Sequence, residues 1–266
     1  MVKFIADIGS NHNRDLDRIY CLIKTSKEVG CWAVKFQLFR PDDLYRVLTY
    51  EKYSELELAS LPWEFIPQIA KWCEEFDLVF GCTPFSIEAV NYLAPYVDYF
   101  KISSYEILRL DLIRECAKYG KPIHISTGMA AIIEIRDAMR ATNRVGGIEL
   151  YHCRADYPTK YYNCGLHCLD MDLYNGWSDH SCEEGVIYQA VAKGIEHVEF
   201  HIDLEDMAGN ESQHGHVWLP SKIKHVIQTA RIMDEADASC DYEMITEEER
   251  NQRADPLDGK RPRILK

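Results

Sequence analysis

The stretch GWSDHS, residues 176–181, lies where a short apolar segment ends. Its last four residues, Ser178 to Ser181, are all polar. Residues 175–178 are typical of a strand, so Asp179 and His180 come directly after it. Side chains of this kind destabilise a protein core unless each one finds a polar partner. This stretch is therefore either a surface loop or the wall of a functional site, and the ends of the other predicted strands decide between the two.

The rest of the chain alternates short apolar runs with longer segments of helical period. Parallel strands need crossover connections, so this alternation favours a parallel sheet with helices packed on it. Eight repeats in 266 residues predict a closed (β/α)₈ TIM barrel, an α/β fold that commonly needs about 250 residues. The predicted strands are 4–8, 33–37, 78–82, 99–102, 122–126, 148–152, 175–178 and 198–201, and the predicted helices are 15–29, 63–76, 86–93, 108–119, 131–141, 183–193 and 221–238. The long 38–62 connection and the weak sixth helix near 167–173 fit this pattern less well.

Composition narrows the class of protein. The formal net charge of −13 argues against nucleic acid or an anionic membrane surface as the main partner. Ten cysteines without a CxxC pair indicate reduced core thiols. The N-terminus is too weakly apolar for a signal peptide, and no run approaches the ~20 apolar residues of a membrane helix. We expect a soluble, cytoplasmic protein.

Polar residues stand at the carboxyl end of every predicted strand. In a barrel these ends meet at one mouth, where active sites lie. One buried lysine or histidine is commonly a satisfied core residue, but eight strands that share the feature indicate a site. In chain order the residues are Asp7 with 11–13, Lys35 with Gln37, Thr83, Lys101 with 103–104, 126–128, His152, 178–180, and Glu199 with His201.

These residue types suit particular chemistry. Two lysines with several serine and threonine hydroxyls can form a cradle for phosphate or carboxylate. His180 and His201, on neighbouring strands, can bind one divalent ion and leave positions open for water and substrate. Asp7, Glu106 and Glu199 are candidates for acid–base work or for holding substrate hydroxyls.

Two of the polar residues at the strand ends have an equally good structural interpretation. In this interpretation, Glu199 has a purely structural role as the partner of a buried lysine. In the same way, His152 has a purely structural role as a hydrogen-bond partner of the backbone.

Eight motifs occur in an order and spacing typical of one enzyme family: ADIGSNHN, AVKFQ, CTPF, FKISSYE, ISTGM, HCRADYP, WSDHS and VEFHI. Across residues 3–235 the chain resembles the barrel domain of the sialic acid synthase (N-acetylneuraminate synthase) family. The resemblance implies a transferase of carbohydrate biosynthesis that joins phosphoenolpyruvate to an aldose. The acceptor would be an amino sugar such as N-acetylmannosamine or a related sugar, and the products a 2-keto-3-deoxy sugar acid and phosphate. It also implies a divalent metal cofactor, with manganese expected.

The resemblance also implies roles for individual residues. His180 and His201 would bind the metal. Asp7, Lys101 and Glu106 would be catalytic, with Asp7 near the reacting carbons and Glu106 contacting the sugar. Substrate binding would fall to Lys35, Gln37, Thr83, Ser104, Ser126, Tyr157, Ser178 and Glu211, with Gln213 as the alternative to Glu211.

The chain departs from the family at three places within the barrel. Asp7 stands where the family carries glutamate, and a displacement near 1 Å at reacting groups can cost on the order of 100-fold in rate. Ala155 replaces a polar residue that helps to bind phosphoenolpyruvate. The segment 208–214 is two residues longer than the family's run near the sugar.

The family's C-terminal antifreeze-like domain has no counterpart in this sequence. We expect residues 1–240 to form the barrel and residues 241–266 to form a charged tail. One hypothesis makes this tail a lid in which Arg253 or Arg261 contacts the sugar, and the alternative is a solvated segment. The resemblance implies a homodimer as the expected oligomer.

Two other classes of function compete with the synthase. One is a metal-dependent barrel aldolase or isomerase, which the changes at Asp7 and Ala155 favour. The other is a non-catalytic ligand-binding relative. The presence of both lysines and both histidines argues against the latter, because buried charge is costly without a catalytic use.

Overall fold

The computed structural model describes residues 1–237. Backbone contacts divide the chain into two units, Met1–Asp234 and Glu235–Lys266. The first unit is described below. The predicted tail, with Arg253 and Arg261, lies outside the described residues, so its role as a lid stays a prediction.

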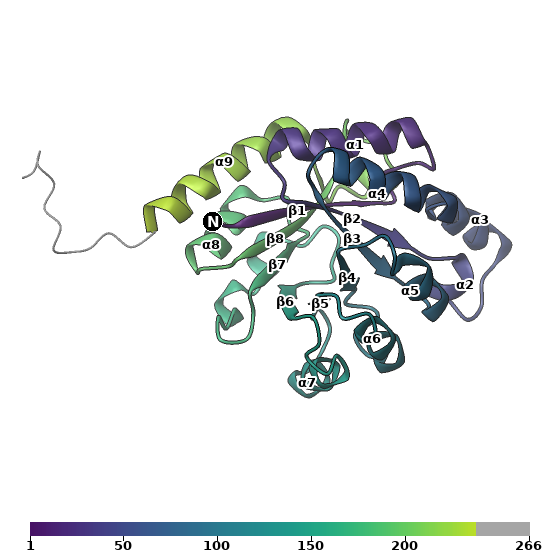
Figure 1. Ribbon diagram of the computed structural model, residues 1–266. Helices are drawn as coiled ribbons and strands as arrows, with labels where there is room; N and C mark the ends of the chain where they lie inside the picture. The colour runs from purple at the N-terminus through teal and green to yellow at the C-terminus, as the bar shows by residue number, and fades with distance from the viewer. Residues whose placement is uncertain (238–266) are drawn as a thin grey trace, which may run out of the picture. The chain divides into compact units, whose positions relative to one another are not determined.

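Eight parallel strands follow one another around a closed barrel, and β1 pairs with β8 to complete the ring. Figure 1 shows the strands at the centre with the helices outside them. The predicted TIM barrel is thereby confirmed, and each predicted strand is present with small shifts at its ends. The strands are β1 (Lys3–Gly9), β2 (Ala33–Leu38), β3 (Val79–Pro84), β4 (Tyr99–Ile102), β5 (Ile123–Ser126), β6 (Ile148–Cys153), β7 (Gly176–Asp179) and β8 (His197–Ile202).

All seven predicted helices are present, and local chemistry fixes the ends of the first. Asp15 caps the start of α1 by accepting hydrogen bonds from the backbone N–H groups of Asp17 and Arg18. Gly30 ends the same helix with φ 101°, a conformation that favours glycine. The helices are α1 (Leu16–Val29), α4 (Ile66–Glu75), α5 (Ile87–Leu93), α6 (Leu110–Ala117), α7 (Ile132–Ala141), α8 (Glu184–Ala192) and α9 (Pro220–Asp237).

Two connections fitted the predicted repeat poorly: the 38–62 segment, expected to be a loop, and the sixth connection, expected to hold a weak helix. The structure differs from both expectations. The 38–62 segment contains α2 (Pro41–Leu44) and α3 (Tyr50–Ala59), and α3 has no buried residue. Apolar periodicity could not reveal a helix that buries no face. The sixth connection has no α-helix but two 3₁₀ turns, Tyr161–Asn163 and Leu166–Cys168. A short strand, β9 (Val217–Trp218), pairs with the end of β8 and was not predicted.

The interior of the barrel changes character along its axis. At the amino ends of the strands, Ile5, Ala33, Tyr99 and Tyr151 form a small apolar cluster. At the carboxyl ends the residues facing inward are charged or polar, among them Asp7 opposite Lys35 in the β1–β2 register. The side chains that alternate with them pack outward against the helices in the main hydrophobic core. The polar strand ends are therefore gathered inside one end of the barrel.

Two further expectations concern the thiols and the membrane. Every cysteine within residues 1–237 is a free thiol; six of these nine are buried, as expected of core cysteines, whereas Cys21 and Cys168 are exposed and Cys182 is partly exposed. Among the described helices, none has the length and apolarity that crossing a bilayer would require.

Candidate active site

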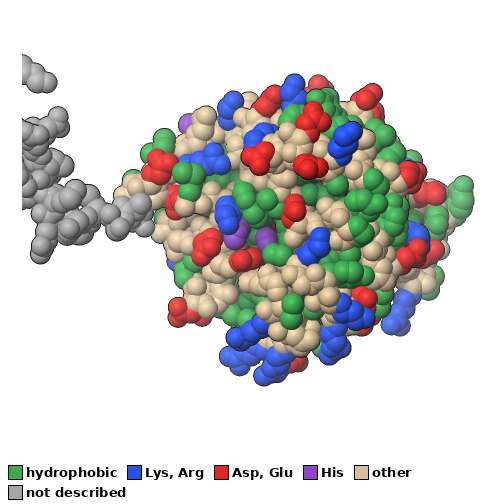
Figure 2. Space-filling model, in the orientation of Figure 1, with side chains coloured by type: hydrophobic (Ala, Val, Ile, Leu, Met, Phe, Trp, Pro, Cys, Tyr) green, Lys and Arg blue, Asp and Glu red, His purple; other side chains and the backbone are tan. Residues whose placement is uncertain are grey.

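A cavity of about 610 Å³ opens at the carboxyl ends of the strands. Figure 2 shows histidine side chains in the middle of this face with acidic and basic side chains around them. All thirteen residues that the resemblance assigned to catalysis, substrate binding or metal binding line this cavity, as does the acid–base candidate Glu199, whereas His152 and Gln213, the alternative to Glu211, do not. The thirteen are Asp7, Lys35, Gln37, Thr83, Lys101, Ser104, Glu106, Ser126, Tyr157, Ser178, His180, His201 and Glu211.

A larger cavity, about 890 Å³, lies near the amino ends of β2, β3 and β4. Trp32, Leu78 and Asp98 are among the residues that line it. Active sites of TIM barrels lie at the opposite end, and the polar residues of the strand ends do not line this cavity. Its size alone does not make it the functional site.

Asp7 and Lys35 form a buried ion pair on adjacent strands, with 2.6 Å between Oδ2 and Nζ. Gln37 donates a longer hydrogen bond of 3.4 Å to the same oxygen. Burial alone would raise the pKa of Asp7, but the charges of Lys35 and His201 lower it to about 2. Burial would likewise lower the pKa of Lys35, and the carboxylates of Asp7 and Glu199 raise it above its ordinary range. Both side chains are therefore charged at neutral pH.

Lys101 is the second buried lysine, and it contacts Ser126 Oγ. Its Nζ lies 3.5 Å from Glu199 Oε1, which also accepts a hydrogen bond of 3.1 Å from Ser178 Oγ. Burial lowers the pKa of Lys101, and Glu199 opposes that effect. Glu199 therefore pairs with a buried lysine, which is the structural interpretation given for it in the sequence analysis. Its Oε2 is buried without a partner in the described part of the chain.

Hydroxyl groups surround the two ammonium groups. Thr83 Oγ1 lies 3.5 Å from Lys35 Nζ. Ser104 Oγ accepts a hydrogen bond of 3.1 Å from the Gly128 backbone N–H and contacts Cys153 Sγ at 3.1 Å. Two lysine side chains and several hydroxyl groups are thus close together on this side of the cavity, and whether they hold an anion stays a prediction.

His180 and His201 lie beside this group of side chains, with their ring centroids 5.4 Å apart. His180 Nδ1 is 2.6 Å from the Arg154 carbonyl oxygen, so Nε2 is the nitrogen left for a ligand. Burial and the charge of His201 lower the pKa of His180 to about 3, which keeps it neutral, as metal binding requires. Tyr157 packs over His180 with 4.2 Å between ring centroids.

His201 contacts carboxylates on its other side. Its Nδ1 lies 2.7 Å from Glu211 Oε2 and 3.7 Å from Asp7 Oδ2. Burial alone would lower the pKa of His201, but Glu211 and Asp7 raise it to about 9. The two carboxylates therefore favour the protonated form of His201, with Glu211 as its hydrogen-bond partner.

Glu211 is held against the end of β1. The Ser10 backbone N–H donates to Glu211 Oε1 at 3.0 Å, and Asn11 Oδ1 accepts from the backbone N–H groups of Glu211 and Ser212. Gly9 has φ 50°, and a Cβ there would lie 2.2 Å from Glu211 Oε1. Glycine at this position thus lets the Glu211 carboxylate approach the backbone.

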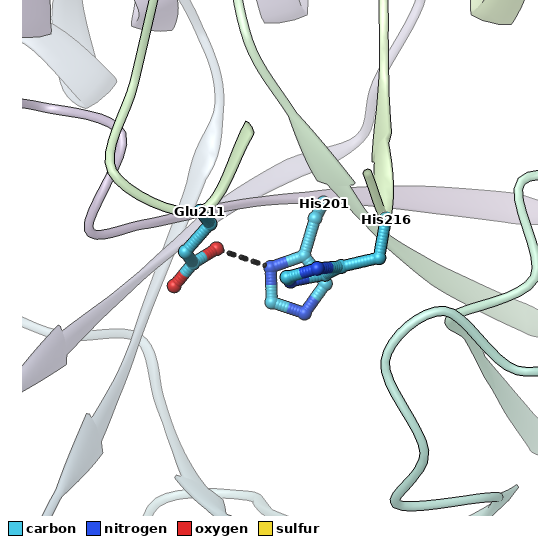
Figure 3. A group of neighbouring side chains, drawn as sticks. All are labelled: His201, Glu211 and His216. Carbon is cyan, nitrogen blue, oxygen red and sulfur yellow. Dashed lines mark hydrogen bonds and ion pairs between the residues drawn. The ribbon is translucent and has the colours of Figure 1, made fainter. Parts of the chain in front are cut away.

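His216 also lines the cavity, and sequence reasoning missed it. The residue lies just before β9, whose pairing with the end of β8 brings it beside His201, with 4.8 Å between ring centroids. Figure 3 shows Glu211, His201 and His216 together. Ligand atoms of these three residues all lie within 4.8 Å of one another. The His-Gly-His spacing of residues 214–216 ahead of an apolar pair was the available signal.

Glu106 is another buried acid that lines the cavity. Its Oε2 is 3.3 Å from Arg109 Nη1. Burial raises the pKa of Glu106, and Arg109 only partly offsets the effect. This position suits contact with a substrate hydroxyl. Ala155, by contrast, has no polar side chain and does not line the cavity.

Comparison with protein families shows to which family this chain belongs. The model of the NeuB family matches residues 22–241. The chain belongs to the NeuB family. The predicted membership of a sialic acid synthase-like family of enzymes is thereby confirmed.

Several relatives of this NeuB family protein are known. An uncharacterized protein of Methanocaldococcus jannaschii is 31% identical over 241 residues, which cover 86% of this chain and 70% of that protein. The N,N'-diacetyllegionaminic acid synthase of Campylobacter jejuni is 30% identical over 259 residues, covering 87% and 76%.

Solved structures agree with the barrel. The N-acetylneuraminic acid synthetase of Leptospira borgpetersenii, determined with citrate, superposes with a TM-score of 0.85 over 94% of this chain and 90% of that one. At 22% identity, this likeness supports the fold alone. The spore coat polysaccharide biosynthesis protein SpsE of Bacillus subtilis has a TM-score of 0.79 at 27% identity, covering 93% and 72%.

Proposed function

We propose that this NeuB family protein condenses phosphoenolpyruvate with an aldose to give a 2-keto-3-deoxy sugar acid and inorganic phosphate. The observation that carries the proposal is the cradle of Lys35, Lys101, Ser126 and Ser178 directly beside His180 and His201 in one cavity. Relatives named as synthases of legionaminic and pseudaminic acids support the same class of product.

The two lysines and their hydroxyl neighbours would hold the carboxylate and phosphate of phosphoenolpyruvate. Each lysine is compensated by a carboxylate, Lys35 by Asp7 and Lys101 by Glu199. The two ammonium groups would supply positive charge next to the bound anion, and the serine and threonine hydroxyls would add hydrogen bonds to it. Burial strengthens these contacts because the effective dielectric is lower than in water.

In the proposed reaction, the C2=C3 π electrons of the enolpyruvyl group form a bond from C3 to the aldehyde carbon, while the aldehyde C=O π bond breaks and its oxygen takes up a proton. Water adds to C2, and the C2–O bond to phosphate then breaks, so phosphate leaves with the bonding electron pair. Asp7, ionised beside Lys35 and His201, would orient the water that adds to C2 or accept its proton. Glu106 and Tyr157 would contact sugar hydroxyls.

A divalent cation fits the histidine side of the cavity, because His180 is neutral and its Nδ1 is already bonded to a backbone carbonyl, an arrangement common for metal ligands. Bound by His180 and His201, such a cation would act as a Lewis acid toward the sugar aldehyde oxygen. Manganese remains the proposed metal, and the acceptor would be an amino sugar such as N-acetylmannosamine or a related aldose.

Phosphate release tests the proposal. Full-length protein with Mn²⁺ and phosphoenolpyruvate is offered N-acetylmannosamine, diacetamido-hexoses and simple aldoses in turn. We expect phosphate release only with an acceptor sugar. Removal of one preorganised charge donor by Lys101→Met should lower kcat on the order of 100-fold or more. Lys193→Met, which removes an exposed lysine on the barrel surface, is the matched control and should leave the rate unchanged.

Two results would contradict the proposal. One is the absence of phosphoenolpyruvate binding by calorimetry, which would favour the aldolase or isomerase class instead. The other is phosphate release that needs no sugar and persists in Lys101→Met.

A further inference from the structure

His216 reaches the cavity through the unpredicted strand β9. Its side chain is 5% exposed, and its Nδ1 is buried with no hydrogen-bond partner among residues 1–237. An unpaired buried ring nitrogen costs free energy, so a native protein that keeps one commonly has an unrecorded ligand for it. The His216 side chain lies beside two other potential donors, Glu211 and His201, rather than in an apolar core.

The three residues converge on one point. Figure 3 shows the Glu211 carboxylate directed at the rings of His201 and His216. Glu211 Oε2 and His201 Nδ1 are already 2.7 Å apart, a distance at which a cation could replace the shared proton. Two imidazoles and one carboxylate are a ligand set that suits first-row divalent ions.

The surroundings hold this ligand set in place. Ser10 and Asn11 fix Glu211 against the end of β1, as described above. On the other side, Trp218 Nε1 donates a hydrogen bond of 3.0 Å to the fully buried carboxylate of Asp179. That bond fixes β9, and with it His216. Partners of this kind orient ligands and support metal affinity.

The local charge also favours a cation. The carboxylates of Asp7 and Glu211 both lie near His201 Nδ1, and Lys35 compensates only Asp7 directly. A divalent ion bound at Glu211 would place positive charge next to this second carboxylate. The side facing His180 and the cavity stays free for further ligands.

We propose that Glu211 and His216 are metal ligands alongside His201, so that this chain binds its divalent cation with a carboxylate and a histidine from the 203–218 segment. The inference rests on the proposed function for the use of the metal, but it can be tested without turnover. It assigns to Glu211 a role in metal binding in addition to the sugar contact that the resemblance implies.

The test is Mn²⁺ binding to the full-length protein after chelation, followed by calorimetry and by the EPR signal of free Mn²⁺, with no phosphoenolpyruvate or sugar present. Loss of a supporting partner of a ligand costs about 10–100-fold in metal affinity, so His216→Ala and Glu211→Gln should each cost at least about 100-fold. His225→Ala removes an exposed histidine on α9 that does not line the cavity and should bind Mn²⁺ like the unmodified protein. Circular dichroism of the metal-free variants checks that each one folds.

A folded His216→Ala protein with unchanged Mn²⁺ affinity would overturn the inference. Pulsed EPR gives an independent count, because a nitrogen coupling from His216 should disappear in that variant while the coupling from His201 remains. If affinity falls as expected but no sugar supports phosphate release, the metal site stands and the proposed reaction fails. If phosphate is released while His216→Ala binds Mn²⁺ normally, the reaction stands and the inference fails.

Discussion

Lys35 Nζ lies 2.6 Å from Asp7 Oδ2, and both side chains are almost completely buried. Removal of one partner from such a pair leaves an uncompensated buried charge, which costs about 3–5 kcal/mol. We therefore expect Asp7→Asn and Lys35→Met each to lower the free energy of unfolding by about that amount. The double variant should lose much less than the sum of the two.

Urea unfolding of the four proteins in this cycle measures the coupling. Lys52 and Glu55 are a geometric control, since they are 2.8 Å apart but both exposed. Lys52→Met should change stability by no more than about 1 kcal/mol. Additive effects of Asp7→Asn and Lys35→Met would show that the two charges do not act as a pair.

Asp179, the acid of the GWSDHS stretch, connects β7, which precedes His180, with β9, which follows His216. It accepts hydrogen bonds from the indole N–H groups of Trp177 and Trp218 and from Ser181. Asp179→Asn turns one acceptor into a donor and should cost about 1–3 kcal/mol of unfolding free energy. Mn²⁺ affinity should fall as well, because β9 directly follows His216 and positions it.

The matched control for this prediction is Asp172→Asn on the exposed surface, which should stay within about 0.5 kcal/mol of the unmodified protein. Thermal unfolding and Mn²⁺ titration of both variants check it. Full retention of stability in Asp179→Asn would show that its hydrogen bonds contribute little.

His197, on the amino-terminal side of β8, predicts a pH dependence. Burial and the charge of Lys3 lower the pKa of His197 to about 4. The folded protein therefore binds fewer protons than the unfolded chain below the ordinary histidine pKa of 6.5. Stability attributable to this residue is complete above 6.5 and is lost as the pH falls toward 4. From pH 7 to pH 5 the loss should be about 2 kcal/mol.

The measurement compares urea unfolding of the unmodified protein and His197→Gln at pH 7 and pH 5. The variant should lose about 2 kcal/mol less over this interval. An equal loss in both proteins would assign the pH dependence to other groups. His225→Gln, at an exposed position on α9, controls for the general effect of removing a histidine.

Metal removal should lower the stability of the protein. A ligand that binds only the folded state adds about 2.7 kcal/mol at a free concentration one hundred times its Kd. We expect Mn²⁺ to raise the melting temperature of the full-length chain, and EDTA to reverse the rise. In His201→Ala the melting temperature should not respond to Mn²⁺. A response that persists in that variant would place the ion elsewhere.

Local pattern in the sequence was enough to predict the barrel. The strand β4 was predicted with its observed bounds, and α1 begins at an aspartate cap and ends at a glycine. The polar residues at the strand ends also predicted the site, because parallel strands in a barrel bring their carboxyl ends to one mouth. The strands and helices depend on residues that are neighbours along the chain. The position of the polar residues depends on the symmetry of the barrel.

Only the tertiary structure decided how those side chains pair. The partner of Lys35 is Asp7 on the preceding strand, and register across the sheet sets that contact. The place of Glu211 depends on Ser10 and Asn11, and the place of His216 depends on the pairing of β9 with β8. The 203–216 segment has no apolar periodicity, so long-range hydrogen bonds rather than local propensity determine where its side chains lie.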